Sequence, residues 1–228
     1  MSRGHTMTAE PSPYYADPLV TLYLGDCREV APALAFDSVL ADPPYGVGWN
    51  TDPDRSRGGP GFPPITGDDE PFDPAWMLAL ERPLITWGAN HYASALPDSP
   101  SWLVWDKRPS GHVNDQADCE MAWSNLGGPA RMFRKAWQGG GTLARENGTY
   151  RRSWHPTQKP VALMGWCLEK LSGTVLDPYT GSGSTLVAAK QLGRKAIGIE
   201  IEERYCEAAA IRLSQGSLFE MAEQGRPA

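Results

Sequence analysis

Patterns typical of metal-binding and disulfide-rich proteins are absent from this sequence. Its 228 residues include four cysteines and four histidines, all widely spaced, without a C-x-x-C or an H-E-x-x-H pattern. These absences argue against a zinc site and against a dense disulfide framework. No apolar run approaches the ~20 residues that span a bilayer, and the polar first 13 residues do not resemble a secretory signal. We therefore expect a cytoplasmic protein with no bound metal and no contact with a membrane.

The sequence also lacks an excess of positive charge. It carries 21 Lys and Arg against 27 Asp and Glu, a formal net charge of −6, which argues against a histone-like or polybasic nucleic-acid binder. The charge is unevenly distributed, however. Residues 1–100 carry five basic and fourteen acidic groups, a net charge of −9, whereas residues 101–160 carry nine basic and five acidic groups, a net charge of +4. The bulk value is therefore compatible with a local basic surface.

Short apolar segments alternate with segments of helical spacing along most of the chain. This alternation predicts an α/β sheet with helices on both faces, and the chain length suits one domain rather than two. The expected strands lie at 19–24, 38–41, 83–87, 102–105, 120–123, 173–177 and 195–200. The expected helices lie at 27–34, 76–80, 161–171, 184–192 and 202–213. Residues 46–74 and 127–154 are rich in glycine and proline or lack periodicity, and we expect them to be irregular.

One strand–turn–helix–strand pattern predicts a ligand site. Asp177 ends the first strand, and the following turn contains Gly181 and Gly183, which permit close approach of the backbone to a ligand. The second strand ends at Glu200, 23 residues after Asp177, where an acid can bind two ribose hydroxyls. Because the complete G-x-G-x-x-G pattern is missing, a nicotinamide-dependent oxidoreductase is disfavoured. Taken alone, the two glycines are equally compatible with an ordinary turn.

The segment Asp177-Pro178-Tyr179-x-Gly181-x-Gly183-Ser184 resembles the S-adenosylmethionine-binding motif of amino-methylating DNA methyltransferases. The resemblance implies that this turn holds the methionine and ribose parts of the cofactor, with Asp177 at the methionine amino group and Glu200 at the ribose. Two more segments resemble family segments: Gly25-Asp26, near the cofactor adenine, and 155–160 (HPTQKP), near the methionine carboxylate. The cofactor-binding residues implied in this way are Asp26, Thr157, Lys159, Asp177, Tyr179, Gly181, Gly183, Ser184 and Glu200.

The tetrapeptide Asp42-Pro43-Pro44-Tyr45 follows a short apolar strand and resembles the catalytic motif of the same family. The exocyclic amino group of a base is a poor nucleophile, and hydrogen bonds from it to the Asp42 carboxylate and the Pro43 carbonyl make its lone pair more available. The two prolines fix φ at about −65°, and Tyr45 offers an aromatic face to a base flipped out of the duplex. The alternative is a rigid strand exit with a core tyrosine.

The catalytic motif precedes the cofactor motif, an order that resembles the β group of these enzymes. The resemblance implies a circularly permuted Rossmann-like methyltransferase fold, with a mixed, mostly parallel sheet of seven strands and helices on both faces. We expect a flexible N-terminal arm at 1–18, a single domain at 19–213 and a tail at 214–228. A small target-recognition insertion is expected within about 107–154.

The basic, aromatic middle of the chain is the expected contact with double-stranded DNA. The alternative is a solvated basic face with buried aromatic side chains. We expect a monomer or a homodimer. The basic residues expected to face DNA are Lys107, Arg108, Arg131, Arg134, Lys135, Arg151 and Arg152.

The leading hypothesis is a site-specific DNA methyltransferase that uses S-adenosylmethionine to methylate N6 of adenine in a flipped-out base. The alternative is N4 of cytosine, for which the family often has Ser rather than Asp before Pro-Pro-Tyr, so Asp42 favours adenine. An RNA methyltransferase and a non-catalytic nucleic-acid-binding module are more remote hypotheses. The module would be expected to lack catalytic or cofactor residues, and these are present.

Overall fold

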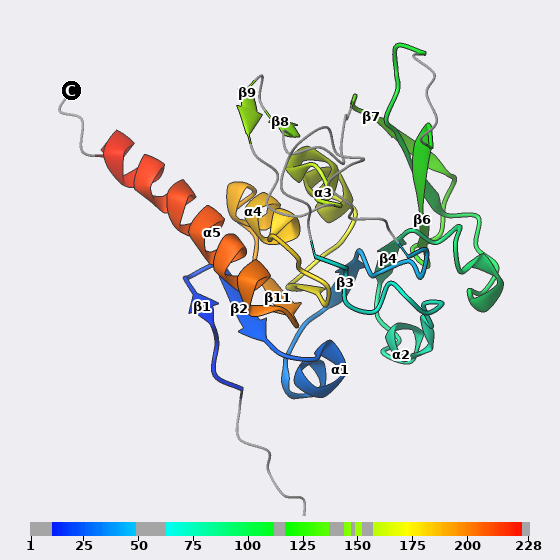
Figure 1. Ribbon diagram of the computed structural model, residues 1–228, viewed down its shortest axis with the longest axis horizontal. Coiled ribbons are helices and arrows are strands. Elements are labelled where there is room, and N and C mark those ends of the chain that lie inside the picture. Colours follow the sequence, from blue (N-terminus) through cyan, green and yellow to red (C-terminus); the bar gives the residue numbers. More distant parts are fainter. Residues whose placement is uncertain are drawn as a thin grey trace, which may run out of the picture.

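The computed structural model describes residues 11–48, 63–111, 117–136, 144–146, 149–151 and 157–224. Its main feature is a sheet of nine strands (Figure 1). In spatial order these are β1 (Tyr15–Ala16), β2 (Val20–Leu24), β11 (Ala196–Glu200), β10 (Val175–Asp177), β3 (Ser38–Ala41), β4 (Leu84–Trp87), β6 (Cys119–Ser124), β5 (Trp102–Asp106) and β7 (Arg131–Arg134).

The strands from β2 to β4 in this order are parallel to their neighbours. β6 runs antiparallel to both β4 and β5, between which it is inserted. All seven strands expected from the sequence are present, and the sheet is mixed and mostly parallel as predicted. Strand β3, which leads into the Asp42-Pro43-Pro44-Tyr45 segment, precedes β10 and β11 in the chain, although it pairs directly with β10 in space.

Two short edge strands raise the number from the expected seven to nine. β1 lies within the segment expected to be a loose arm, where it pairs with β2, and Asp17 Oδ1 closes the turn by accepting the Leu19 and Val20 amides at 2.9 Å. β7 lies in the segment expected to be irregular and pairs with β5. Neither strand was visible in the sequence because most of its side chains are exposed or half-exposed, which leaves no apolar pattern.

The helices are α1 (Cys27–Val30), α2 (Ala75–Leu78), α3 (Val161–Leu168), α4 (Ser184–Gln191) and α5 (Glu203–Gln224). Two short 3₁₀ turns, η1 (Ala31–Ala33) and η3 (Ala93–Ala95), follow α1 and β4. α5 continues into the segment expected to be a C-terminal tail, because residues 214–224 include no proline to end it. A separate hairpin of β8 (Ala144–Glu146) and β9 (Thr149–Arg151) also lies where irregular chain was expected.

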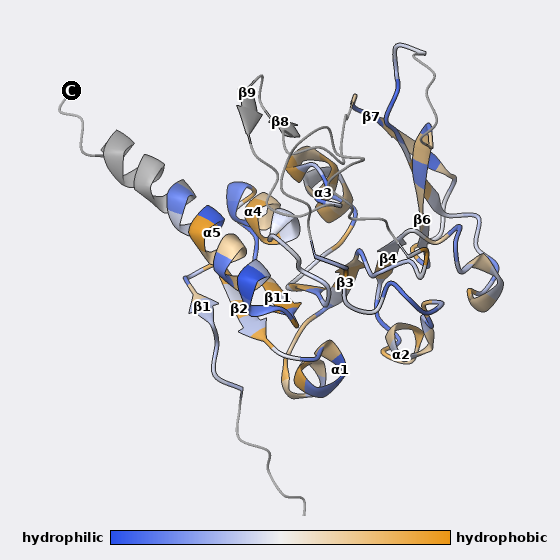
Figure 2. Ribbon diagram, in the orientation of Figure 1, coloured by the Kyte–Doolittle hydropathy of each residue, from blue (hydrophilic) through white to orange (hydrophobic). Residues whose placement is uncertain are grey.

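The sheet is covered on both faces, which explains the continuous apolar runs of its central strands. Leu40 packs with α3, α4 and α5 residues in one core, whereas its neighbours Val39 and Ala41 pack with α1 and α2 residues in a second core. All four residues of β3 are buried. Figure 2 shows hydrophobic residues along α3 and β11, and a mixture of hydrophobic and hydrophilic residues along α1. Among the described residues, no helix is both long and apolar enough to cross a membrane.

Parallel strands place their carboxyl ends at one edge of the sheet, where ligand sites of open α/β sheets lie. Such strands end at Asp177 and Glu200, and Asp42 and Asp26 follow strand ends by one and two residues. The fold therefore brings both sequence motifs to the same edge.

Gly198 in β11 lets the cofactor-like turn lie directly on the sheet. A Cβ atom at this position would be 2.4 Å from Thr180 Oγ1 and 2.8 Å from Leu186 Cδ1. We expect Gly198→Ala to lower the free energy of unfolding by ~1–3 kcal/mol, the usual range for overpacking, in urea titrations. Gly165→Ala in α3 is the matched control, because its Cβ would meet only Leu192 Cδ1 at 3.9 Å. Equal stability of the two variants would contradict this account of the turn.

Candidate active site

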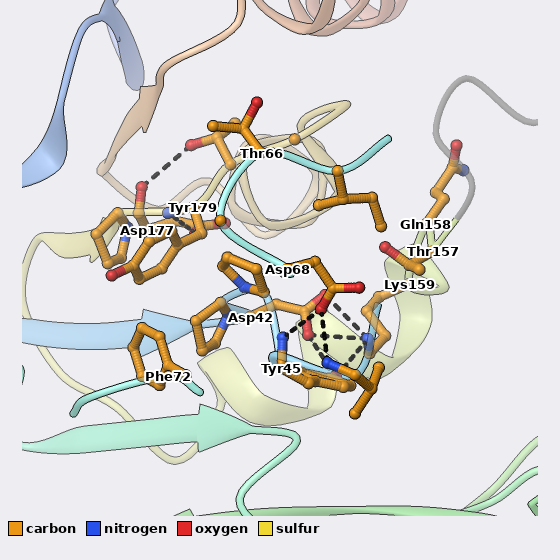
Figure 3. Close-up of a pocket in the computed structure, with 18 of the residues that line it drawn as sticks. Asp42, Tyr45, Thr66, Asp68, Phe72, Thr157, Gln158, Lys159, Asp177 and Tyr179 are labelled. Atoms are coloured by element: carbon orange, nitrogen blue, oxygen red, sulfur yellow. Dashed lines mark hydrogen bonds and ion pairs between the residues drawn. The ribbon is translucent and has the colours of Figure 1, made fainter. Parts of the chain in front are cut away.

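A cavity of about 1430 Å³ opens at the carboxyl edge of the parallel strands and joins the two motifs (Figure 3). Twelve of the thirteen site residues expected from the sequence line it. The exception is Gly183, which has a φ of +84° at the start of α4, and whose Cβ would lie 2.9 Å from the Ala209 Cβ of α5. Gly183 therefore allows α4 and α5 to pack closely, behind the cavity wall.

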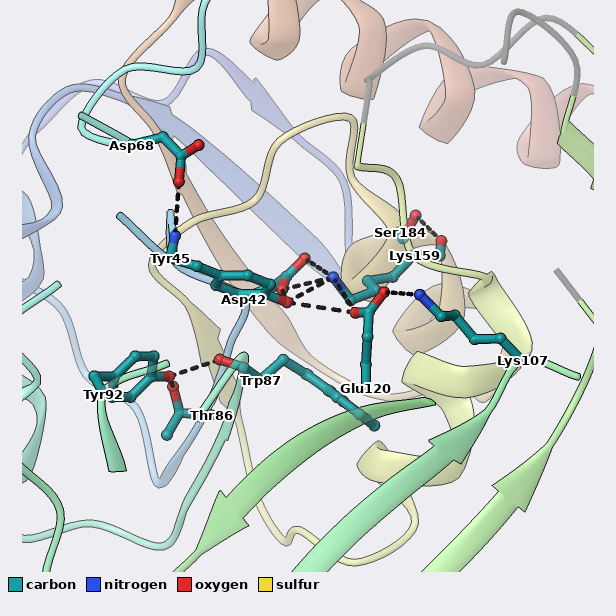
Figure 4. Close-up of polar contacts among 10 residues, drawn as sticks. All are labelled: Asp42, Tyr45, Asp68, Thr86, Trp87, Tyr92, Lys107, Glu120, Lys159 and Ser184. Carbon is teal, nitrogen blue, oxygen red and sulfur yellow. Dashed lines mark hydrogen bonds and ion pairs between the residues drawn. The ribbon is translucent and has the colours of Figure 1, made fainter. Parts of the chain in front are cut away.

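A buried ammonium group lies at the centre of the half of the cavity that contains Asp42 and Tyr45 (Figure 4). Lys159 Nζ is 2.8 and 2.9 Å from the two carboxylate oxygens of Asp42, and 2.9 Å from the Tyr45 hydroxyl. The Tyr45 hydroxyl donates to Asp42 Oδ1 at 2.7 Å. Lys159 is only 5% exposed. Lys159 was expected among the cofactor residues, and the structure places its ammonium group against the Asp42 carboxylate.

Glu120 and Lys107 extend this cluster. Glu120 was not identified as a site residue from the sequence, and Lys107 was expected to face DNA. Glu120 Oε2 is 3.1 Å from Lys159 Nζ, and Glu120 Oε1 accepts a hydrogen bond from Lys107 Nζ at 3.0 Å. Burial alone would lower the pKa of Lys159, but the adjacent Asp42 and Glu120 carboxylates raise it above its usual value. Burial alone would raise the pKa of the Glu120 carboxyl group. Lys159 and Lys107 outweigh this effect of burial, so the pKa of Glu120 is lowered. Lys159 and Glu120 therefore form an ion pair at neutral pH. Burial raises the pKa of Asp42, and the Lys159 ammonium opposes this rise.

The Tyr45 ring is fixed by contacts on the neighbouring segment after β4. It stacks on the His91 ring, with centroids 5.2 Å apart and an interplanar angle of 16°. It also lies against Gly88, where a Cβ atom would be 2.0 Å from the ring, at a φ of +69° that itself favours glycine. A strand ending in glycine was visible in the sequence, but nothing there indicated its contact with Tyr45.

The other half of the cavity holds two buried carboxylates on adjacent strands. Glu200 accepts the Gly181 amide on Oε2 at 2.7 Å and the Glu202 amide on Oε1 at 2.8 Å, so it fixes the glycine turn and the start of α5. Asp177 Oδ1 accepts the Tyr179 amide at 3.1 Å. Burial raises the pKa of both acids, to about 7 for Asp177. An acid desolvated in this way favours a bound cationic or hydroxyl-bearing group.

The remaining predicted residues lie at the cavity with distinct roles. Asp26 Oδ1 accepts the Arg28 amide at 2.8 Å and caps α1. Ser184 Oγ donates to the Lys159 carbonyl at 2.8 Å, which holds the backbone of that lysine. Thr157 is half-buried in the lining.

Two aromatic side chains contact Tyr179, and the sequence did not indicate either contact. Trp76 Nε1 donates to its hydroxyl at 3.0 Å, and Phe72 meets its ring edge-on with centroids 5.8 Å apart. Phe72 and Trp76 lie outside both motifs, so only the folded chain reveals this contact.

The expected basic surface is partly neutralised by local acids. Arg108 lies 3.3 Å from Asp118, and the exposed Arg134 lies 3.7 Å from Asp106. Of the aromatic residues in this segment, Trp123 is buried, and Phe133 packs on Trp166 with centroids 5.4 Å apart. The Arg151 side chain and all of Arg152 lie outside the described part, as do residues 49–62, which include Trp49. In the part that the structure describes, no group of three or more His, Cys, Asp or Glu residues could hold a metal ion.

The raised pKa of Asp177 predicts a pH dependence of stability. Its pKa rises from 3.8 to about 7 on folding, so the folded protein binds the proton more tightly than the unfolded chain. Stability therefore falls as the pH rises from about 4 to about 7. We expect Asp177→Asn to make this decline shallower in urea titrations across that range. Parallel curves for the variant and the unaltered protein would show that Asp177 does not titrate as described.

Comparisons with known proteins connect this geometry to a family. A family model described as DNA methylase matches residues 105–211, which include the glycine turn and Glu200. The putative methylase YubD of Escherichia coli (strain K12) is 30% identical over 219 residues, which span 83% of this chain and 88% of that protein. The type II methyltransferase M2.LlaDCHI of Lactococcus lactis subsp. cremoris is 37% identical over 92 residues, which span 39% of this chain but only 33% of that protein.

A solved structure shows the same fold. It is PvuII DNA methyltransferase (cytosine-N4-specific), with a TM-score of 0.59, 13% identity and coverage of 89% of each chain. At this identity the likeness concerns the fold alone. The match to YubD, by contrast, is at the sequence level and covers 83% of this chain. This chain belongs to the N6/N4 family of DNA methylases.

Proposed function

We propose that the protein is a site-specific DNA methyltransferase that uses S-adenosylmethionine to methylate N6 of adenine in a flipped-out base. The observation that carries this proposal is the single cavity that joins the Asp42 carboxylate to the buried acids Asp177 and Glu200. A methyl acceptor and a methyl donor can therefore meet in one enclosed space. The order of the motifs supports assignment to the β group of these enzymes.

The chemistry of the donor half fits S-adenosylmethionine. Glu200 is ionisable, 8% exposed and tied to two backbone amides, which orients its oxygens to accept ribose hydroxyls. Asp177 is 2% exposed, and its raised pKa shows a carboxylate that a cationic amino group would stabilise. Asp26 is an exposed residue of the cavity lining, on the side assigned to the adenine of the cofactor. When bound, the cofactor supplies an electrophilic methyl group on its sulfonium sulfur.

The chain's own residues act on the acceptor base. The Asp42 carboxylate and the Pro43 carbonyl accept hydrogen bonds from the amino group and orient its nitrogen, and Asp42 is placed to receive the proton that the nitrogen loses. Tyr45 and Lys159 already donate to Asp42. An incoming amino group therefore replaces or shares one of these donors. Stacking on the Tyr45 ring would then hold the base, at ~1–3 kcal/mol for such a contact.

Adenine is favoured over cytosine because Asp rather than Ser precedes Pro-Pro-Tyr. Cytosine N4 is the second candidate, because the same two acceptors suit its amino group and the protein of similar fold is cytosine-N4-specific. Incubation with labelled S-adenosylmethionine and unmethylated DNA, followed by nucleoside mass spectrometry, decides between them. N6-methyladenine is expected. N4-methylcytosine alone rejects the adenine assignment, and methylation of RNA but not DNA rejects both.

The DNA would approach from the side of the basic segment. Arg131 and Arg134 are exposed on β7, and Lys107 lies at the cavity lining. Because several of these cations already have acidic partners, we expect modest non-specific DNA affinity that falls with salt.

Removal of the catalytic carboxylate tests the acceptor site. We expect Asp42→Ala to abolish methyl transfer and to leave cofactor affinity unchanged, since Asp42 contacts only the acceptor half. Glu120 remains beside Lys159 in this variant, 3.1 Å away, so the buried ammonium keeps one counter-charge and the fold should persist. Radiolabel transfer and calorimetry make the two measurements. Near-normal turnover of the variant would remove Asp42 from the mechanism.

Glu200 provides the matching test of the cofactor site. We expect Glu200→Gln to weaken S-adenosylmethionine binding by about 1–3 kcal/mol, the range for hydrogen bonds to a charged group. Glu169→Gln on the outer end of α3 is the control, because Glu169 is exposed and outside the cavity lining. Isothermal titration of both variants gives the affinities, and identical values would remove the ribose role.

A further inference from the structure

Asp68 lies outside every motif, yet it contacts the catalytic loop at three successive positions. Its Oδ1 atom accepts the backbone amides of Tyr45 at 3.1 Å, Gly46 at 2.9 Å and Val47 at 3.3 Å (Figures 3 and 4 show this side chain above the loop). Consecutive amides that converge on one oxygen form an anion-binding nest, and such bonds to a carboxylate are stronger than neutral ones. Asp68 is 5% exposed, so water screens this contact little.

The backbone also joins the two segments. The Gly48 amide donates to the Asp68 carbonyl at 2.8 Å. Gly46 lies so close to the Asp68 segment that a Cβ there would be 2.4 Å from the Glu70 carbonyl oxygen. In the part of the chain that the structure describes, no other hydrogen bond is made by the Tyr45, Gly46 and Val47 amides. The conformation of the loop after Pro44 therefore depends on Asp68 rather than on strand pairing, since β3 ends at Ala41.

The same segment reaches the cofactor half of the cavity. Thr66 Oγ1 donates to Glu202 Oε1 at 2.7 Å, and the amide of Glu202 donates in turn to Glu200. Phe72 contacts the Tyr179 ring. The segment 65–72 thus crosses from the acceptor side to the donor side.

We propose that Asp68 is a positioning residue for the base site. It fixes the Tyr45 backbone, and through it the ring and hydroxyl that meet the flipped base and Asp42. This inference rests on the proposed methyltransferase function. Its role differs from that of Asp42, which would contact the base directly. Asp68 binds the loop amides through Oδ1 and would act on the base only through Tyr45.

The test compares Asp68→Ala and Asp68→Asn with the unaltered full-length protein. The probes are S-adenosylmethionine and genomic DNA from a methylation-deficient host. We expect Asp68→Ala to lower kcat and to raise KM for DNA, with a loss of at least ~10-fold in kcat/KM, as expected when several charge-assisted hydrogen bonds are removed. The dissociation constant for S-adenosylmethionine should stay within about 2-fold, since Glu200 and Asp177 keep their own partners. Asp68→Asn should lose less, because its amide oxygen still accepts the three hydrogen bonds without the charge.

Asp98→Ala is the matched control, because Asp98 is an exposed carboxylate outside the cavity lining. It should match the unaltered protein in every measurement. If Asp68→Ala fails to fold, as circular dichroism would reveal, Asp68→Asn decides: reduced kcat/KM for DNA with unchanged cofactor affinity supports the inference.

Three outcomes overturn the inference: unaltered kinetics in a folded Asp68→Ala protein, unaltered kinetics in Asp68→Asn when Asp68→Ala does not fold, or a loss of cofactor affinity equal to the loss of turnover. The last result would show general support of the cavity rather than positioning of Tyr45. Absence of methyl transfer by the unaltered protein is a different result, since it rejects the proposed function itself.

Discussion

The two ion pairs of the buried Lys159 ammonium are the interactions on which the Asp42 half of the cavity depends. The ammonium stands between the Asp42 and Glu120 carboxylates, at 2.8 and 3.1 Å, and these three residues come from distant parts of the chain. Two carboxylates this close would repel each other strongly without the cation, and a cation this deeply buried would be costly without both acids. The cluster therefore holds the segment before α3 against β3 and β6. It also orients Asp42 and opposes the rise in the Asp42 pKa that burial causes.

This cluster also explains the uneven charge of the sequence. The first hundred residues are strongly acidic, and part of that charge converges with Glu120, Asp177 and Glu200 on one cavity. An acidic interior suits a positively charged cofactor, whereas DNA, a polyanion, would have to be held by the basic segment at the rim. The net charge of −6 thus averages an acidic cavity with a basic neighbouring segment, and those two regions serve different ligands in the proposed function.

The sequence predicted features whose cause is local in the chain. The runs in β3 and β4 are apolar because both faces of these strands are covered, so their positions were predicted to within a residue. The expected cavity residues were found because their spacing follows strand ends and glycine turns. Glu120, His91 and Asp68 were not identified. Each meets Asp42 or Tyr45 only through strand pairing or loop contact between distant segments, and no local spacing encodes such contacts.

Gly183 is a residue that the motif pointed to but that does not line the cavity. A glycine in a cofactor-like turn was expected at the ligand, but its missing side chain makes room for Ala209 of a helix that comes much later in the chain. The two edge strands were missed for a related reason. Strands with exposed side chains at a sheet margin have little hydrophobic periodicity, although the backbone of each pairs with one neighbouring strand.

The reversed direction of β6 has a consequence for how such a protein can diversify. Because β6 runs against its neighbours, it begins at the edge where the parallel strands end, and its first residues Cys119 and Glu120 lie beside the cavity. The chain leaves β5 at Asp106, which pairs with Cys119, so the intervening segment starts and finishes at the cavity rim. Because strand pairing fixes only the two ends of this connection, a change in its length would leave the register of β5 and β6 intact. Differences in length at this side of the cavity are therefore compatible with the fold.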